Sequence, residues 1–302
     1  MSWGMVQHFV RAGRGPELWP VGTVFEVEHP EYYDTNGHSL LFRVVGHDQV
    51  PAADESLTHT MCLDMVDVLF KASYDHSEYI YALTEDTTAQ AGKTYYSESN
   101  GEYSVLTEGV DYEIGDPVPA ASWYEKNPNE RESANNNPIQ SNLIQWANSS
   151  GAANQWFTKQ SLWDTCSSDL AAKNGFCRFL DAEFLSVVKP AKLISNVRNN
   201  GVVYRGVEHN AKFWSLSITQ ITGDTEGGIH ENSWLSSYSE GGSLLKKELS
   251  SGLGLGWWIR SIIPTSSHAI FFVPSDGVFA NWRDRSYVNT NQYGYSLACI
   301  IA

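Results

Sequence analysis

The sequence contains few cysteines, and their spacing matches no metal-binding or redox motif. The four thiols are Cys62, Cys166, Cys177 and Cys299, with no C-x-x-C pair and no histidine at zinc-ligand spacing. We therefore expect reduced thiols and neither a metal nor another cofactor, although sequence alone leaves a bridge between Cys166 and Cys177 open.

Long apolar runs are also missing. No stretch approaches the ~20 consecutive apolar residues that span a bilayer. Residues 1–7 have neither the basic start nor the apolar segment of a signal peptide. We expect a protein that is made in the cytosol, does not insert into membranes, and either stays in the cytosol or leaves the cell by lysis rather than by secretion.

Positive charge is scarce. Lysine and arginine number 20 against 35 aspartates and glutamates, which gives a formal net charge of −15. Nucleic-acid phosphates require a basic face, so this balance argues against nucleic acid as a partner.

Common catalytic motifs are missing as well. The chain has no G-x-S-x-G, H-E-x-x-H, Walker or EF-hand pattern, and its nine histidines are scattered. Residues 252–256 (GLGLG) lack the third-glycine spacing of a dinucleotide fingerprint, and we interpret them as glycines where strands pack closely. The sequence therefore does not predict an enzyme.

What the sequence does contain is a polar and aromatic stretch, residues 281–295, between two apolar segments. Residues 269–273 (AIFFV) and 297–301 (LACII) are rich in the residues of buried strands. Asn, Tyr, Trp, Arg and Ser held between rigid strands are typical of an adaptable recognition surface, although an ordinary surface loop fits the composition equally well.

We predict that the ligand-facing side chains come from this stretch and from the turn before it. They are Ser267, His268, Asn281, Trp282, Arg283, Tyr287, Asn289, Asn291, Tyr293 and Tyr295.

Further elements are predicted from apolar patterning and capping residues. Strands are expected at residues 21–28, 40–46, 212–217 and 257–261, with a turn at Asn36-Gly37 between the first two. Residues 57–70 are expected to form a strand and then a short helix. Helices are expected after the N-cap Ser141, from residues 168–169 onward, and as a turn within 240–250. Residues 1–15 are expected to be a lead-in.

Residues 76–130 differ from their surroundings in composition and in hydrophobic patterning. Short strand patterns at 79–83, 94–97 and 102–106 alternate with turn signals, and acidic residues and border prolines are frequent. We predict an inserted β-rich module whose two ends lie close together.

Amide and hydroxyl side chains surround Trp146 and Trp156, an arrangement that suits stacking on a sugar ring. The helical spacing of Leu143, Ile144 and Trp146 favours the alternative, in which these tryptophans belong to the core.

The order of several short motifs resembles a known family. In sequence they are S-x-x-x-x-W at 141–146, Trp156-Phe157, a V-x-P-like turn at 187–190, W-x-R-S at 258–261, and Gly294 before the last strand. This set is similar to phage and prophage structural proteins with a C-type-lectin-like domain, a fold shared with formylglycine-generating enzymes and variable phage tropism determinants. The likeness covers residues ~16–75 and ~131–302.

The chain also departs from that family. Residues 295–298 (YSLA) stand where many relatives have a G-V-R-P-A type sequence, and Cys299 stands alone where the oxidase branch has a copper-binding pair. Residues 281–284 (NWRD) match a lectin calcium triplet only loosely, and no E-P-N partner motif is present.

The resemblance implies an α+β fold in which a C-type-lectin-like domain at residues 16–302 is interrupted by the module at 76–130. It implies a tail or surface protein of a bacteriophage virion, assembled in the host cytoplasm as a homo-oligomer with other virion proteins. Its C-terminal surface would bind a bacterial receptor, protein or glycan, or a neighbouring subunit. Two alternatives stay open: a structural decoration or adaptor protein, and an enzyme of the formylglycine-generating type that depends on Cys177 or Cys299.

Overall fold

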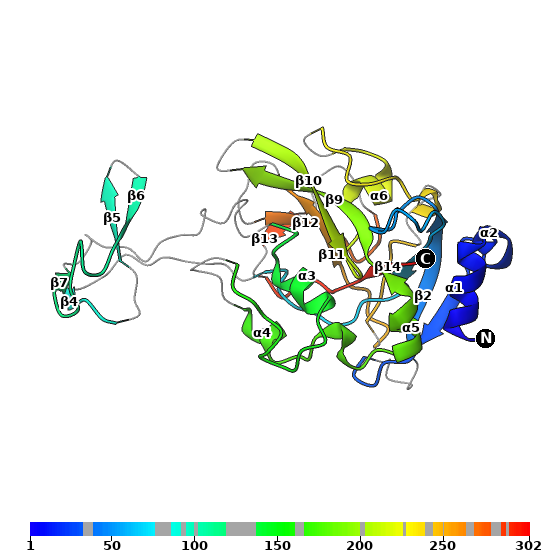
Figure 1. Ribbon diagram of the computed structural model, residues 1–302, viewed down its shortest axis with the longest axis horizontal. Coiled ribbons are helices and arrows are strands. Elements are labelled where there is room, and N and C mark those ends of the chain that lie inside the picture. Colours follow the sequence, from blue (N-terminus) through cyan, green and yellow to red (C-terminus); the bar gives the residue numbers. More distant parts are fainter. Residues whose placement is uncertain are drawn as a thin grey trace.

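The computed structural model shows a mixed α+β protein built from antiparallel strands and short helices (Figure 1). It describes residues 1–32, 39–75, 86–91, 95–99, 102–118, 137–160, 166–199, 203–225, 228–238, 244–249, 251–263, 269–278, 285–287 and 290–302. The predicted α+β class is confirmed, and the Asn36-Gly37 turn lies outside the described residues.

A five-stranded antiparallel sheet forms the centre of the main body. Its strand order is β1-β2-β3-β14-β8. The strands are β1 (Val24–Val27), β2 (Leu40–His47), β3 (Met61–Met65), β14 (Ala298–Ile301) and β8 (Val188–Lys189). Strand β14 is therefore an interior strand, and all four of its residues are buried, as its apolar sequence predicts.

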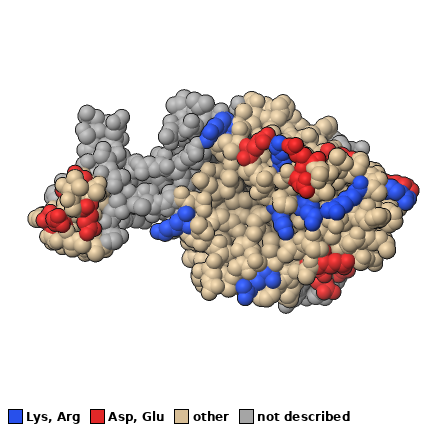
Figure 2. Space-filling model, in the orientation of Figure 1, with Lys and Arg blue, Asp and Glu red and all other residues tan. Residues whose placement is uncertain are grey.

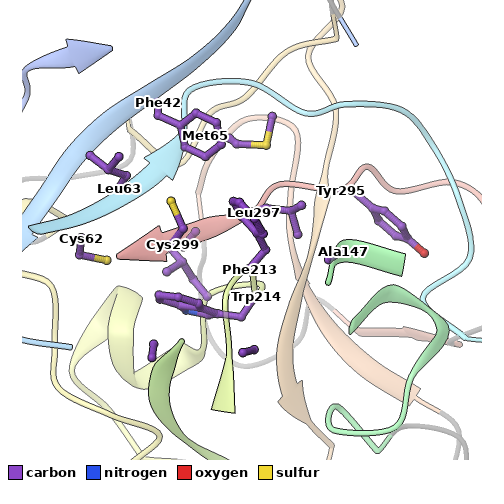
Figure 3. Close-up of a cluster of buried hydrophobic side chains, with 14 of the residues drawn as sticks. Phe42, Cys62, Leu63, Met65, Ala147, Phe213, Trp214, Tyr295, Leu297 and Cys299 are labelled. Atoms are coloured by element: carbon purple, nitrogen blue, oxygen red, sulfur yellow. The ribbon is translucent and has the colours of Figure 1, made fainter. Parts of the chain in front are cut away.

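The core gathers around β14. Cys299 pairs with Leu63, and Ile301 with Met61, on the neighbouring strand β3. Figure 3 shows Phe42, Leu63 and Met65 together with Leu297, Cys299, Phe213 and Trp214 in one buried cluster. Each such side chain contributes about 1.5–3 kcal/mol on burial, so the sheet and the segments over it are held together mainly by apolar packing.

Two smaller antiparallel units complete the main body. One is a three-stranded sheet of β11 (Trp257–Ile262), β12 (Ala269–Val273) and β13 (Arg285–Tyr287). The other is a long hairpin of β9 (Ala191–Asn199) and β10 (Val203–Ala211). The strands expected at 257–261 and 269–273 are confirmed.

The prediction of a strand at residues 212–217 is wrong, because strand β10 ends at Ala211. Only Trp214 forms a bridge there, exchanging two backbone hydrogen bonds with Ala298 at 3.1 and 2.8 Å. The β9–β10 hairpin itself was not predicted. Its buried positions include the polar residues Ser195 and Asn196, which conceal the alternation of a half-buried strand.

The helices are short and lie around the sheets. They are α1 (Trp3–Arg11), α2 (Gly15–Leu18), α3 (Asn142–Ala147), α4 (Ser168–Ala171), α5 (Ala182–Val187), α6 (Ile218–Thr222) and the 3-10 turns η2 (Phe176–Arg178) and η3 (Ser236–Tyr238). The N-cap prediction is confirmed, since Ser141 Oγ accepts a hydrogen bond from Ile144 N at 3.3 Å.

Three helix predictions need correction. The helix expected from residue 168 is broken into α4, η2 and α5, because Gly175 N and Cys177 N donate to the distant carbonyls of Gly151 and Ser149 at 3.0 Å. After β3 the chain forms bends rather than a helix, since Val68 and Leu69 donate backbone hydrogen bonds to distant carbonyls. Residues 244–249, the described part of 240–250, contain no helix.

Residues 1–15, expected to be a lead-in, contribute helix α1 to the main core. Val6 and Val10 are buried in the same cluster as the central sheet, and α1 packs against α5. Gln7 Nε2 also donates a hydrogen bond to the Ala302 carbonyl at 2.6 Å. Helix α1 therefore covers the end of strand β14.

The module between residues 86 and 118 has a small core of its own. Its strands are β4 (Thr87–Thr88), β5 (Tyr95–Ser99), β6 (Glu102–Leu106) and β7 (Pro117–Val118), paired as β4–β7 and β5–β6. Ala89, Tyr95, Tyr112 and Val118 form a cluster separate from the main core. Figure 1 draws these strands apart from the main body, and Figure 2 shows acidic side chains on the described part of the module's surface. The predicted β5–β6 hairpin is confirmed, whereas the strand expected at 79–83 lies outside the described residues.

The segments on either side of this module are hydrogen-bonded to each other. Leu143 N donates to the Tyr74 carbonyl at 3.2 Å, and Asn142 N contacts Asp75 Oδ1 at 3.4 Å. The insertion therefore leaves and re-enters the main body at neighbouring points.

Replacing residues 76–136 with a short Gly/Ser linker should leave a cooperatively folded main body. The linker joins points already held together, and loop closure costs only about 0.6 kcal/mol per doubling of loop length. Thermal unfolding followed by circular dichroism measures the result. Asp75 and Asn137 are kept because both are buried. Loss of the cooperative transition in the shortened chain would show that the module is part of the main fold.

A buried ion pair lies beside β14. The Lys247 ammonium contacts Asp64 Oδ2, the Met65 carbonyl and Ser296 Oγ, each at 2.5 Å. Tyr238 donates its hydroxyl proton to the same carboxylate oxygen at 2.6 Å. Burial lowers the pKa of Lys247, while Asp64 acts against this shift. Each of the two buried charges thus lies beside its counter-charge, which offsets part of the cost of desolvation.

Lys247→Met should lower the free energy of unfolding by about 3–5 kcal/mol, because it leaves the Asp64 carboxylate buried without its cation. Lys246→Met is the matched control, since Lys246 is exposed and pairs with Glu248 at 3.4 Å; it should cost no more than about 1 kcal/mol. Urea unfolding of both variants measures the difference, and equal losses would contradict the assignment.

Candidate ligand-binding site

The predicted C-terminal surface begins and ends on buried strands. Strand β12 before it and strand β14 after it are almost wholly buried. Six of the ten predicted residues lie outside the described part of the chain: Ser267, His268, Asn281, Trp282, Arg283 and Asn289. Of the other four, Tyr287 is the last residue of β13, where its backbone pairs with Ala269, and Asn291 is exposed.

Tyr293 is half-buried, and its ring packs against aromatic side chains of the core. Its ring stacks on Phe272 at 3.9 Å between centroids and meets Trp258 edge-on at 4.7 Å. Both partners belong to the three-stranded sheet. Tyr293 therefore has a packing role in addition to any contact that its exposed edge makes.

The prediction that Tyr295 faces a ligand is wrong. Its side chain is fully buried between Phe70 and Trp146, and its hydroxyl donates a hydrogen bond to the Ser73 carbonyl. Burial raises the pKa of Tyr295. Composition alone groups Tyr295 with the surface residues, although its side chain belongs to the main core.

The returning chain is fixed to the core by backbone hydrogen bonds. Gly294 donates to the Gly256 carbonyl at 2.8 Å and accepts from Trp258 N at 3.1 Å. Tyr295 exchanges two backbone hydrogen bonds with the segment at residues 69–70. A Cβ at Gly294 would lie 2.8 Å from Val68 Cβ, so glycine permits this approach. The segment available for recognition therefore ends near residue 292.

The W-x-R-S motif provides a buried polar network rather than a surface. Arg260 is 2 % exposed and donates to Asn232 Oδ1 at 2.7 Å, to the Glu231 carbonyl at 3.1 Å and to Ser195 Oγ at 3.2 Å. Burial lowers the pKa of Arg260 to about 10, so the guanidinium stays charged at neutral pH. It joins β11 to the β9–β10 hairpin and to residues 231–232.

Glu231 lies in the same network. One carboxylate oxygen accepts from Asn196 N at 2.8 Å, and the other accepts from the Ser261 hydroxyl. Burial raises the pKa of Glu231, although Arg260 opposes that shift. The arginine and the serine of the motif therefore hold β9 and the 231–232 turn in place.

The tryptophan cluster near residue 150 belongs to the core, as its helical spacing predicts. Trp146 is fully buried and donates Nε1–H to the Asn174 carbonyl at 2.7 Å. Trp156 is 6 % exposed and donates to the Lys173 carbonyl at 2.9 Å. Neither ring presents an open face for stacking on a sugar.

All four cysteines, each within the described residues, are thiols. Burial raises the pKa of Cys177 to about 11 and also raises the pKa of Cys299. Thiols with a raised pKa stay protonated at neutral pH, which makes them weak nucleophiles and weak metal ligands. Across the described ranges, no group of three or more His, Cys, Asp or Glu side chains is arranged to hold a metal ion.

A cavity of about 470 Å³ opens elsewhere, between residues 48–60 and the β9–β10 hairpin. Its lining includes the carboxylates of Asp48, Glu55 and Glu208 and the ammonium of Lys192. Sequence patterning could not have located it, because residues more than a hundred positions apart form its walls.

Comparisons with known proteins add no relatives: no family model, no curated protein and no solved structure matches this chain. In the described part of the chain, none of the helices has the length and apolar character required to cross a bilayer.

The polar network predicts a specific pH dependence. Ser195 Oγ accepts a hydrogen bond from Arg260 Nε and lies 2.9 Å from His209 Nε2. The Ser195 hydroxyl therefore has its proton free to donate to His209 Nε2. Burial, reinforced by the charge of Arg260, lowers the pKa of His209 to about 4. In the unfolded chain a histidine titrates near 6.5, so below that pH the unfolded state binds a proton that the folded state does not.

Stability should therefore fall as the pH drops from about 6.5 towards 4, and His209→Gln should reduce this loss by up to about 2 kcal/mol between pH 6.5 and 5. Urea unfolding at a series of pH values measures the slope. His8→Gln, at an exposed position of α1, serves as the control. Identical pH slopes for His209→Gln and the original chain would contradict the role of His209.

Proposed function

We propose that this chain is a ligand-binding protein of a bacteriophage virion, with a C-type-lectin-like fold and a recognition surface formed by residues 274–292. The observation that supports the proposal is the way this segment is held. It leaves the buried strand β12 and returns through Gly294 and Tyr295, which are hydrogen-bonded to the core. Exposed side chains between these points, such as Asn291, can change without loss of the fold, as a recognition surface requires.

The motif order that resembles lectin-like phage proteins supports the same proposal. Several of those motif residues have structural roles here: Ser141 caps α3, Trp146 is buried, Arg260 orders the polar network and Gly294 permits close packing. The partner in this proposal is a protein or glycan on the bacterial surface, and the chain acts together with other virion proteins.

A second candidate function, that of a structural decoration or adaptor protein, is favoured by the separate module. Its residues Val110 and Ile114 are 80 % and 54 % exposed, although both are apolar. Exposed apolar residues on a small module suit contact with a neighbouring subunit. In this case the segment 274–292 would contact a virion protein instead of a receptor.

Immunogold electron microscopy of particles from an induced lysate tests the location. We expect an antibody against this chain to label the tail or another surface of the particle. If the chain is present in the lysate but all particles stay unlabelled, the virion assignment fails.

Replacing Asn289 and Asn291 together with alanine should weaken binding of the purified chain to host cells by about tenfold or more, with an unchanged melting temperature. Asn291 is exposed, so its loss removes hydrogen-bonding capacity without opening the core. Asn210→Ala, an exposed asparagine on β10, is the matched control. Unchanged cell binding together with lost incorporation into particles would favour the adaptor function, and unchanged behaviour in both assays would contradict both.

A further inference from the structure

The cavity beside the β9–β10 hairpin has firmly held walls. Lys192 N donates to the Pro51 carbonyl at 2.8 Å, and Ala53 N donates to the Pro190 carbonyl at 2.8 Å. These bonds fix residues 51–53 against the start of β9. The cavity therefore exists without a ligand, as small-molecule sites commonly do.

Another lining residue, Asn232, is also fixed in place. Its side chain accepts from Ile194 N at 2.9 Å and donates to the Lys192 carbonyl at 3.0 Å. Arg260 donates to the same amide oxygen at 2.7 Å. The buried network around the W-x-R-S motif thus also supports a wall of this cavity.

The lining has an excess of negative charge. Asp48, Glu55 and Glu208 carry carboxylates, while Lys192 supplies the single ammonium among those lining residues that the structure describes. A lining with this balance disfavours anions and favours a ligand that carries a positive charge.

The position of Lys192 shows where such a charge fits. Its ammonium lies 3.5 Å from Glu55 Oε1 and 3.5 Å from Glu208 Oε2, so it bridges a loop and strand β10. The three side chains are 36 %, 83 % and 63 % exposed, and ion pairs this exposed contribute little to stability. A ligand ammonium can therefore take the place of the Lys192 ammonium at small cost.

The remaining lining matches a hydroxylated ring. Leu57 and Ile194 offer apolar contact, and Thr58 brings a hydroxyl group, whereas the Thr60 hydroxyl already donates to the Val50 carbonyl at 2.8 Å. The volume of about 470 Å³ lies in the lower part of the range for small-molecule sites.

We propose that this cavity binds an amino sugar with a free amine, whose ammonium lies between Glu55 and Glu208. The site is distinct from the segment 274–292 and does not rest on the proposed virion function. Lys192 occupies the ammonium position in the absence of ligand and competes with it.

Titration calorimetry with glucosamine as the probe tests the proposal on the full chain. We expect saturable binding that weakens with salt, and none with N-acetylglucosamine, whose nitrogen is uncharged. Glu55→Gln with Glu208→Gln should weaken glucosamine binding by about tenfold or more. Lys192→Met should strengthen it, because the competing ammonium is removed.

The matched control is Glu108→Gln with Glu113→Gln, which removes two exposed carboxylates from the separate module and should leave binding unchanged. Melting temperatures of all variants verify folding. Because the substituted side chains are exposed or half-buried, we expect these temperatures to stay unchanged. No saturable glucosamine binding, equal binding of N-acetylglucosamine, binding that persists in the Glu55/Glu208 variant, or weaker binding by Lys192→Met would each overturn the proposal.

Discussion

The arrangement of the main body depends on satisfying one buried cation. A guanidinium has five N–H donors and keeps its charge, so burying Arg260 requires acceptors on every side. Those acceptors come from β9, from residue 215, from helix α6 and from the turn at 231–232. Since each is a backbone carbonyl or a side chain that is itself held in place, the network fixes the β9–β10 hairpin against β11. Apolar packing alone does not specify that orientation, because it lacks direction.

Local signals in the sequence were sufficient where an element's own residues determine its structure. The apolar segments of β2, β11, β12 and β14, the cap at Ser141 and the strands β5 and β6 are examples. The β9–β10 hairpin was missed because the polar residues Ser195 and Asn196 are buried, where Arg260 donates to Ser195 Oγ and the Asn196 backbone N–H donates to Glu231. The interruption of the helix after Ala171 was missed because its cause, hydrogen bonds from Gly175 and Cys177 to the carbonyls of Gly151 and Ser149, is a contact between separate segments.

The candidate surface shows that sequence-based prediction has the same limit for single residues. Asn291, Tyr293 and Tyr295 belong to one polar and aromatic stretch, yet the first is exposed, the second half-buried and the third buried. The difference arises at Gly294, where hydrogen bonds to Gly256 and Trp258 draw the chain inward. Composition identified a stretch suited to recognition, but only the three-dimensional contacts show where such a surface must end.

The pairing of β14 with β3 has a consequence for the order in which the molecule folds. Ala298 and Asp64 are paired although they lie about 230 positions apart, and contacts this distant form slowly because a large loop must close first. Hairpin β5–β6 joins residues only a few positions apart and can form within microseconds. The small module is thus able to acquire its structure while the central sheet still lacks an interior strand. During that interval the unpaired edges of β3 and β8 are open to pairing with another chain, which makes the closing of β14 the step most exposed to misassembly.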